Sequence, residues 1–198
     1  MIKPLNQKEI GFFITEISNS FYIIRESNEK IDVNYTKCKN QLSGYNITYF
    51  TKWNIKSSFP ESLSEIKIDA SNYLFDSKCP LKYSIQNAFD GNPATSYVEN
   101  TEDDLMTIDV WLGKPVEKMA IINGYAKNYE LYKKNNRIKQ IGNHFNLEDN
   151  NLEYQIIPCR GTNIPFTSFY KGNEFNDTCI AEINFMYEKK WIFGDIYE

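Results

Sequence analysis

Residues 87–99 read Asn-Ala-Phe-Asp-Gly-Asn-Pro-Ala-Thr-Ser-Tyr-Val-Glu. The stretch has neither the alternation of a strand nor the apolar stripe of a helix, and its Asp-Gly and Asn-Pro dipeptides are typical of tight turns. Asp90 offers a carboxylate and Thr95 a hydroxyl, and the bends leave backbone carbonyls outside any sheet. Calcium prefers such oxygen ligands. Two interpretations stay open: a calcium-binding loop, or a plain turn in which Asp90 accepts hydrogen bonds from its own backbone.

Short segments on both sides of this loop predict strands. Residues 106–112 alternate between apolar and polar side chains, as in a half-buried strand of an antiparallel sheet. Further strands are predicted at 10–14, 21–24, 45–55, 66–69, 116–123, 137–141, 144–147, 152–157 and 180–187, with a long loop at 123–136. The first two runs suit a hairpin, but either could instead be a buried helical segment. Many short strands separated by turn signals favour an all-β sandwich.

Residues 57–62 are predicted to be a connector, and we place an approximate domain boundary there. We expect residues 1–62 to be a β-rich N-terminal segment that either adds strands to the sandwich or forms a small appendage. Residues 63–190 form the main domain, and residues 191–198 are expected to be a C-terminal tail.

Composition excludes several classes of partner. The 22 Lys and Arg residues against 26 Asp and Glu give a net charge of −4, so a nucleic-acid backbone is not an expected partner. No apolar run reaches membrane-spanning length. The first residues lack a signal peptide's apolar core, which leaves a cytosolic protein and an exported one both open. Four cysteines without CxxC spacing and a single histidine, His144, argue against zinc.

Two loops combine tyrosine with polar side chains, at residues 123–137 and 170–178. A tyrosine ring can stack on the apolar face of a sugar while amides and charged groups bond its hydroxyls. The alternative is that these tyrosines cover the bases of the loops and the polar groups are only solvated. The residue types favour neither interpretation.

Four blocks in order carry a resemblance to a known family. The stretch at 87–99 resembles the signature loop of galactose-binding-like, discoidin-type domains. The blocks Ile-Ile-Asn-Gly-Tyr-Ala-Lys at 121–127, Tyr-Lys-Lys-Asn-Asn-Arg-Ile-Lys at 132–139 and Tyr-Lys-Gly…Asp-Thr-Cys-Ile-Ala-Glu-Ile at 170–183 resemble the glycan-binding domain of bacterial NAD glycohydrolases, which is implicated in toxin translocation. The similarity covers residues 65–187.

The resemblance implies a jelly-roll β-sandwich whose end loops bind carbohydrate, in a secreted, periplasmic or surface bacterial protein. It also implies a structural calcium bound by Asp90, Thr95 and Glu182, with carbonyls near Phe89 and Asn92. The competing interpretation pairs Glu182 with a lysine or arginine. Tyr97 replaces the tryptophan usual after the threonine. NAD hydrolysis is not implied, because the catalytic part of that toxin is a separate domain, and we expect no enzyme here.

The predicted glycan site lies on the 123–137 and 170–177 loops. Its expected residues are the stacking tyrosines Tyr125 and Tyr132, the hydroxyl-binding Asn123, Asn135, Arg137 and Asp177, with Tyr170 beside them and Glu99 at the edge. The alternative function is a protein-interaction module on the same scaffold. The four cysteines leave two interpretations open, disulfides or free buried thiols. If the protein is exported, Cys79 and Cys179 are the expected disulfide pair, because the signature loop and the last strand should meet where the sandwich closes.

Overall fold

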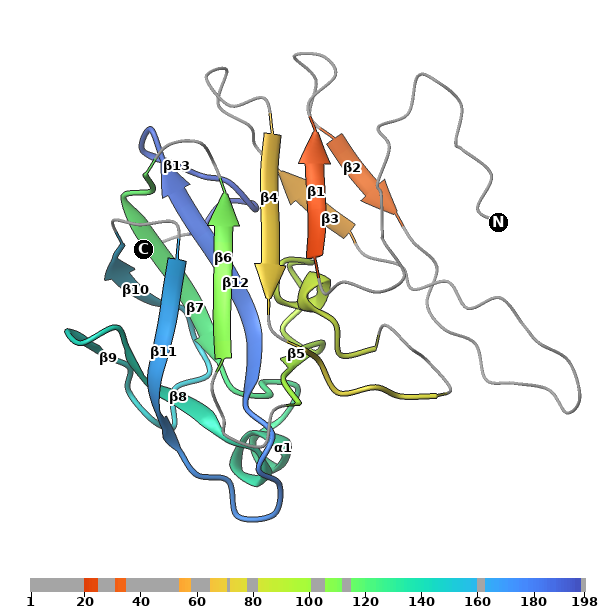
Figure 1. Ribbon diagram of the computed structural model, residues 1–198, viewed down its shortest axis with the longest axis vertical. Coiled ribbons are helices and arrows are strands. Elements are labelled where there is room, and N and C mark those ends of the chain that lie inside the picture. The colour runs from red at the N-terminus through yellow and green to blue at the C-terminus, as the bar shows by residue number, and fades with distance from the viewer. Residues whose placement is uncertain are drawn as a thin grey trace, which may run out of the picture.

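The computed structural model describes residues 20–24, 31–34, 54–57, 65–70, 72–77, 82–100, 106–111, 115–159 and 163–196. They form two large antiparallel sheets, one packed on the other, and a separate two-stranded sheet (Figure 1). The two-stranded sheet pairs β2 (Ile31–Asn34) with β3 (Asn54–Ser57).

The six-stranded sheet contains, in spatial order, β1 (Ser20–Ile24), β4 (Glu65–Ala70), β6 (Met106–Trp111), β11 (Asn163–Tyr170), β8 (Arg137–Ile141) and β9 (Phe145–Asn146). Its first strand, β1, comes from the N-terminal segment and pairs with β4 from Ser20 opposite Asp69 to Ile24 opposite Glu65. The N-terminal segment therefore contributes a strand to the sandwich.

The five-stranded sheet contains β10 (Gln155–Pro158), β7 (Lys118–Asn123), β12 (Cys179–Tyr187) and β13 (Lys190–Trp191), and β5 (Tyr97–Val98) pairs with the start of β12. The pairing of β12 with β7 shifts register between Ile180 and Glu182. Such a bulge re-aims the side chains next to it. Here it lies beside Glu182, whose carboxylate reaches the loop that starts at Asp90.

Apolar side chains from both sheets meet in one core. Its buried members include Ile68, Ile108, Ile138 and Ile164 of the six-stranded sheet, and Met119, Ile121, Ile183 and Phe185 of the five-stranded sheet. Full burial of each such side chain is worth about 1.5–3 kcal/mol. The short 3-10 helix η1 (Ile85–Ala88) and Phe89 also lie in this core, and the Phe89 ring centroid is 4.9 Å from that of Phe193. The signature loop is thus anchored at its first residues.

The predicted all-β sandwich is confirmed, and most of its strands lie where the sequence indicated. The predicted segments at 21–24, 66–69, 106–112, 116–123, 137–141, 144–147, 152–157 and 180–187 overlap β1, β4, β6, β7, β8, β9, β10 and β12. The predicted strand at 10–14 and most of the one at 45–55 lie outside the described residues.

Several elements were not predicted, among them β2, η1, β5 and β13. The 123–136 stretch is not all loop, because it contains the helix α1 (Tyr129–Lys134). Strand β11 was missed because it contains Pro165, which cannot donate to a sheet ladder. Pro165 is tolerated because pairing with β8 begins only at Phe166. Trp191, Ile192 and Phe193, the first residues of the expected C-terminal tail, are buried against the sandwich.

The disulfide prediction is wrong at Cys179. Its thiol is free and fully buried, and burial raises the pKa of the thiol well above its usual value. Cys79 lies outside the described residues. None of the helices in the described part of the chain is long and apolar enough to cross a membrane.

Candidate functional site

Helix α1 lies at one end of the sandwich, next to the connection from β11 to β12 (Figure 1). Asn128 caps it, because its Oδ1 accepts a hydrogen bond from the Leu131 N–H at 2.8 Å. Glu130 in the first turn and the lysines in the last turn complement the helix dipole. The helix starts where it does because the cap and the dipole both favour that position.

Two tyrosines one turn apart on α1 lie against each other. The rings of Tyr129 and Tyr132 are nearly parallel, with centroids 6.2 Å apart and planes at 9°. Tyr132 is fully buried, whereas Tyr129 is 53% exposed. The inner ring is therefore part of the core, and the outer ring rests on it and faces solvent.

The burial of Tyr132 depends on Gly124. The backbone of Gly124 has a φ of +73°, and a Cβ there would lie 2.8 Å from the Tyr132 ring and 2.6 Å from Cγ of Arg137. Only glycine leaves the space that Tyr132 fills. The Asn-Gly-Tyr block of the sequence thus supports the base of this end of the molecule.

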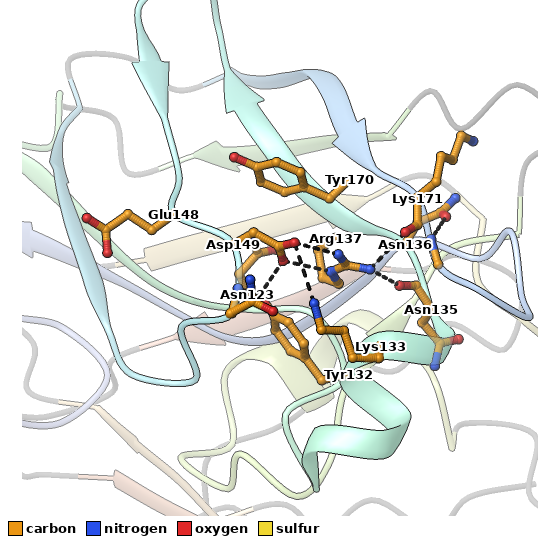
Figure 2. Close-up of polar contacts among 12 residues, drawn as sticks. Asn123, Tyr132, Lys133, Asn135, Asn136, Arg137, Glu148, Asp149, Tyr170 and Lys171 are labelled. Carbon is orange, nitrogen blue, oxygen red and sulfur yellow. Dashed lines mark hydrogen bonds and ion pairs between the residues drawn. The ribbon is translucent and has the colours of Figure 1, made fainter.

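Arg137 lies at the centre of a polar network (Figure 2). Its Nε and Nη2 donate to the two carboxylate oxygens of Asp149 at 3.1 and 2.8 Å, and its Nη1 donates to the backbone carbonyls of Asn135 and Lys171, both at 3.0 Å. Arg137 is 3% exposed. Its planar fork therefore joins the end of α1, the loop after β9 and the loop after β11.

Two tyrosine rings enclose the same guanidinium. Its Cζ is 5.2 Å from the centroid of the Tyr132 ring and 5.9 Å from that of Tyr170, distances at which a cation is attracted to an aromatic face. The Tyr132 hydroxyl donates to Asp149 at 3.2 Å, and the Tyr170 hydroxyl donates to the Leu147 carbonyl at 3.0 Å. Both phenols are fixed in place.

The network sets two pKa values in opposite directions. Burial, followed by the charge of Asp149, raises the pKa of Tyr132 to about 12, so the phenol stays protonated and can donate. Burial alone would raise the pKa of Asp149, but hydrogen bonds from Arg137 and Asn150 and the nearby positive charges outweigh it, and the pKa is lowered. Asp149 is therefore ionised at neutral pH.

Asn136 and Gly172 fasten the β11–β12 loop to α1. Asn136 Nδ2 donates to the Asn176 carbonyl, and its Oδ1 accepts from the Gly172 N–H at 2.8 Å. A Cβ at Gly172 would lie 2.3 Å from the Lys134 carbonyl oxygen, so no larger residue fits without movement. The loop is held against the helix by backbone contact.

Several predicted glycan ligands are in fact structural. The Asn123 side chain is fully buried and exchanges two hydrogen bonds with the backbone of Ile138, at 2.7 and 2.9 Å. Tyr132 cannot serve as a stacking platform because its ring is buried, and Arg137 directs its donors to Asp149 and to carbonyls. These predictions are corrected: the residues form the base of the site.

The other predicted residues divide by exposure. Glu99 is fully buried and cannot form an exposed edge, and Asn135 is 5% exposed with its amide donating to the Leu131 carbonyl. Tyr125, Tyr170 and Asp177 are half-buried. The pKa of Tyr125 is raised, mainly by burial and in addition by its electrostatic interaction with Tyr83. A glycan contact by these three stays a prediction.

Sequence reasoning missed the outer residues of this end. The Tyr129 hydroxyl donates to Asn150 Oδ1 at 3.1 Å, and the Lys133 ammonium lies 5.6 Å from the Tyr129 ring centroid and 3.8 Å from Asp149. The N-cap at Asn128 is the one sequence signal that could have revealed a helix here and hence the spacing of Tyr129 and Tyr132.

The signature loop brings two carboxylates together. Asp90 and Glu182 are 7% and 2% exposed, and the Gly91 N–H donates to Glu182 Oε2 at 3.3 Å. Thr95 Oγ1 is 2.9 Å from Asp90 Oδ2 and 2.7 Å from the Asn92 carbonyl oxygen. The predicted group of Asp90, Asn92, Thr95 and Glu182 is therefore assembled in space, with the carbonyl of Asn92 turned to the others and its side chain accepting from Ala94.

The two carboxylates oppose each other's ionisation. Burial, followed by the charge of Asp90, raises the pKa of Glu182 well above its usual value. Within the described residues, no hydrogen bond reaches Glu182 Oε1. Tyr154 lies near this carboxylate pair. Its pKa is raised, mainly by burial and in addition by the negative charges of Glu182 and Asp90. A buried negative pair of this kind fits a cation.

A cavity of about 210 Å³ lies around the turn between β8 and β9. Apolar side chains such as Ile141, Phe145 and Ile157 line it, and His144 and Cys159 lie in its wall. The turn follows the end of β8 opposite to Arg137, so this cavity is separate from the network around that residue.

The chain has no detectable match among curated protein sequences. Solved structures that match part of this chain include a family 89 glycoside hydrolase from Clostridium perfringens in complex with GlcNAc-α-1,4-galactose, with a TM-score of 0.36, 18% identity, and coverage of 60% of this chain and 14% of that one. The same enzyme in complex with PUGNAc also has a TM-score of 0.36 and 18% identity, over 62% of this chain and 15% of that one.

A family model gives a direct assignment. It matches residues 60–186, which contain both the signature loop and the Arg137 network, and so covers most of the described sandwich. The chain belongs to the family of the NAD glycohydrolase translocation F5/8 type C domain.

Proposed function

We propose that this sandwich is a carbohydrate-binding module of a secreted or surface bacterial protein, and that glycan binds at the loop end. The loop end comprises residues 123–137, 147–151 and 170–178. One observation carries the proposal: Tyr129, a residue that is 53% exposed, holds its ring nearly parallel to the buried ring of Tyr132. An aromatic face with polar groups at its rim is the arrangement that sugars require.

Rigidity supports this assignment. A shallow sugar site makes few contacts, so any entropy lost on ordering the protein would cancel much of the binding free energy. Here the ring of Tyr129 is supported from below by Tyr132, and its hydroxyl is held by Asn150 at 3.1 Å. The Arg137 and Asp149 pair in turn fixes the loop that contains Asn150. The platform is therefore preorganised.

The test is a glycan array with the protein displayed on multivalent beads, because single sites of this kind bind weakly. We expect the wild type to bind a defined set of glycans and Tyr129→Ala to lose that signal. Phe75→Ala is the matched control, since Phe75 is an aromatic side chain 63% exposed on a different segment, and it should bind as the wild type does. Full retention of binding by Tyr129→Ala, or no glycan bound by the wild type, would contradict the proposal.

We also propose that calcium occupies the signature loop in a structural role. The side chains of Asp90, Thr95 and Glu182 and the carbonyl of Asn92 supply hard oxygen ligands of the type calcium prefers. The orphaned Oε1 of Glu182, among the described residues, supports this fit. The cation would neutralise two buried carboxylates and tie the loop to β12.

A further inference from the structure

We infer that the glycan bound at Tyr129 is uncharged, and that Lys133 contributes to its recognition as a hydrogen-bond donor rather than as the partner of an anionic group. This inference rests on the proposed function, and it names the chemical class of ligand for the same site. It follows from the distribution of charge over the loop end.

The loop end has equal numbers of positive and negative side chains. The cations are Lys127, Lys133, Lys134, Arg137 and Lys171, and the anions are Glu130, Glu148, Asp149, Glu174 and Asp177. A surface that attracts sialylated or sulfated glycans needs a cationic surplus, because exposed charges act through the summed field of their neighbours. The loop end has no such surplus.

The strongest cations are also already paired. Arg137 is committed to Asp149 at 2.8 Å, and Lys134 lies 2.9 Å from Glu130 and 3.2 Å from Glu174. An incoming carboxylate or sulfate would have to displace one of these partners and leave it without its cation. Displacement of this kind costs about as much as the new pair returns.

Lys133 differs from these cations because its ion pair is long. Its ammonium is 3.8 Å from Asp149 Oδ2, beyond hydrogen-bond distance, and both Asp149 oxygens already accept from Arg137. The ammonium lies over the Tyr129 ring, 5.6 Å from its centroid, so a sugar that packs against this ring comes within its reach. It can donate to a hydroxyl while Asp149 balances its charge.

The same carboxylate disfavours an anionic substituent. An anionic group that reached Lys133 would come close to Asp149, which is ionised at neutral pH because its pKa is lowered by Arg137 despite burial. At about 4 Å in water, the repulsion between Asp149 and an anionic group of the glycan is about as large as the attraction between that group and the Lys133 ammonium. A hydroxyl meets no such opposition.

The test compares glycans that differ only in charge. The probes are sialylated oligosaccharides and their neutral methyl esters, together with neutral oligosaccharides and their 6-O-sulfated forms, measured against the full chain by calorimetry or biolayer interferometry. We expect the neutral member of each bound pair to bind more tightly, by about fivefold. We also expect affinity to change by less than about twofold between 50 and 500 mM NaCl.

Variants of Lys133 separate hydrogen bonding from charge. Lys133→Gln keeps a donor without the charge and should bind a neutral oligosaccharide within about twofold of wild type, whereas Lys133→Met should bind about fivefold more weakly. Lys190→Met, at an exposed lysine of β13 outside the loop end, is the control and should change little. Tighter binding of the anionic probes, or a steep loss with salt, overturns this inference and leaves the glycan function intact. Failure to bind any probe overturns both.

Discussion

Two buried polar clusters of this sandwich solve the problem of a buried carboxylate in opposite ways. In the Arg137 cluster, Asp149 has a cation from its own chain at 2.8 Å. In the Glu182 cluster, Glu182 faces another carboxylate, that of Asp90. The pKa of Asp149 is lowered and the pKa of Glu182 is raised, although burial acts upward on both.

The difference distinguishes a structural cluster, around Arg137, from a candidate cation site, around Glu182. The Arg137 cluster is internally satisfied, so it can hold the loop end rigid without any ligand. The Glu182 cluster is stable with both groups ionised only if a cation joins it, since buried like charges are costly. One cluster therefore supports the proposed sugar platform, and in the other the proposed cation would tie the signature loop to β12.

The largest expected effect comes from removing Arg137. Arg137→Met should lower the free energy of unfolding by about 3 kcal/mol, near the lower end of the range for breaking a buried pair, because the Asp149 side chain keeps 22% exposure. The substitution also leaves the carbonyls of Asn135 and Lys171 without their donor. Urea unfolding followed by fluorescence gives the measurement.

Lys134→Met is the matched control for Arg137→Met. Lys134 also pairs with carboxylates, at 2.9 and 3.2 Å, but it lies on the surface, where solvent screens such pairs. Its loss should change stability far less. Equal destabilisation by the two variants would show that the Arg137 cluster is no more than another surface ion pair.

Calcium should give the next largest effect. Addition of calcium at about 100 times its dissociation constant should stabilise the chelated protein by about 2.7 kcal/mol. For a chain of this length, that corresponds to a rise of several degrees in the thermal midpoint. Differential scanning fluorimetry with EGTA and with added calcium measures it.

Glu182→Gln isolates the carboxylate pair in that experiment. It removes one of the two charges, so chelator should shift its midpoint much less than that of the wild type. Glu148→Gln, a change at an exposed acidic residue, should respond to calcium as the wild type does. An unchanged wild-type midpoint on chelation would mean that the Asp90 and Glu182 pair is satisfied without metal.

The fold was predictable from the sequence where local pattern and burial agree. The alternation in residues 106–112 and 180–187 corresponds to β6 and β12, because one side of each pattern meets the core. The pattern of alternating residues does not predict β11, because this strand contains Pro165. The proline is tolerated only because the pairing of β11 with β8 begins after it, at Phe166. That information lies in another part of the chain and in the register between strands.

The candidate site shows a similar limit. The sequence predicted a site on the 123–137 and 170–177 loops, but it could not say whether a tyrosine or an asparagine in them faces solvent or the interior. That choice is made by tertiary packing: the space left by Gly124 admits Tyr132 and leaves Tyr129 outside. Buried Asn123 likewise satisfies the Ile138 backbone, a partner that local sequence does not reveal.

The smallest expected effect is the contribution of Asp149 to the pH dependence of stability. Its folded-state pKa is lowered: burial opposes this, but the hydrogen bonds and charges around Arg137 prevail. Ionised Asp149 therefore stabilises the fold at pH values above its unfolded-state value of about 3.9, and this contribution is lost as pH falls from there through the folded-state pKa.

Asp149→Asn tests this sign directly, because asparagine does not titrate. The difference in unfolding free energy between wild type and variant should be constant from pH 7 to pH 5 and should shrink below about pH 3.9, as wild-type Asp149 takes up a proton. A difference between wild type and Asp149→Asn that grows as pH falls would mean that Arg137 does not hold Asp149 in its ionised form, and the contrast with Glu182 would then disappear.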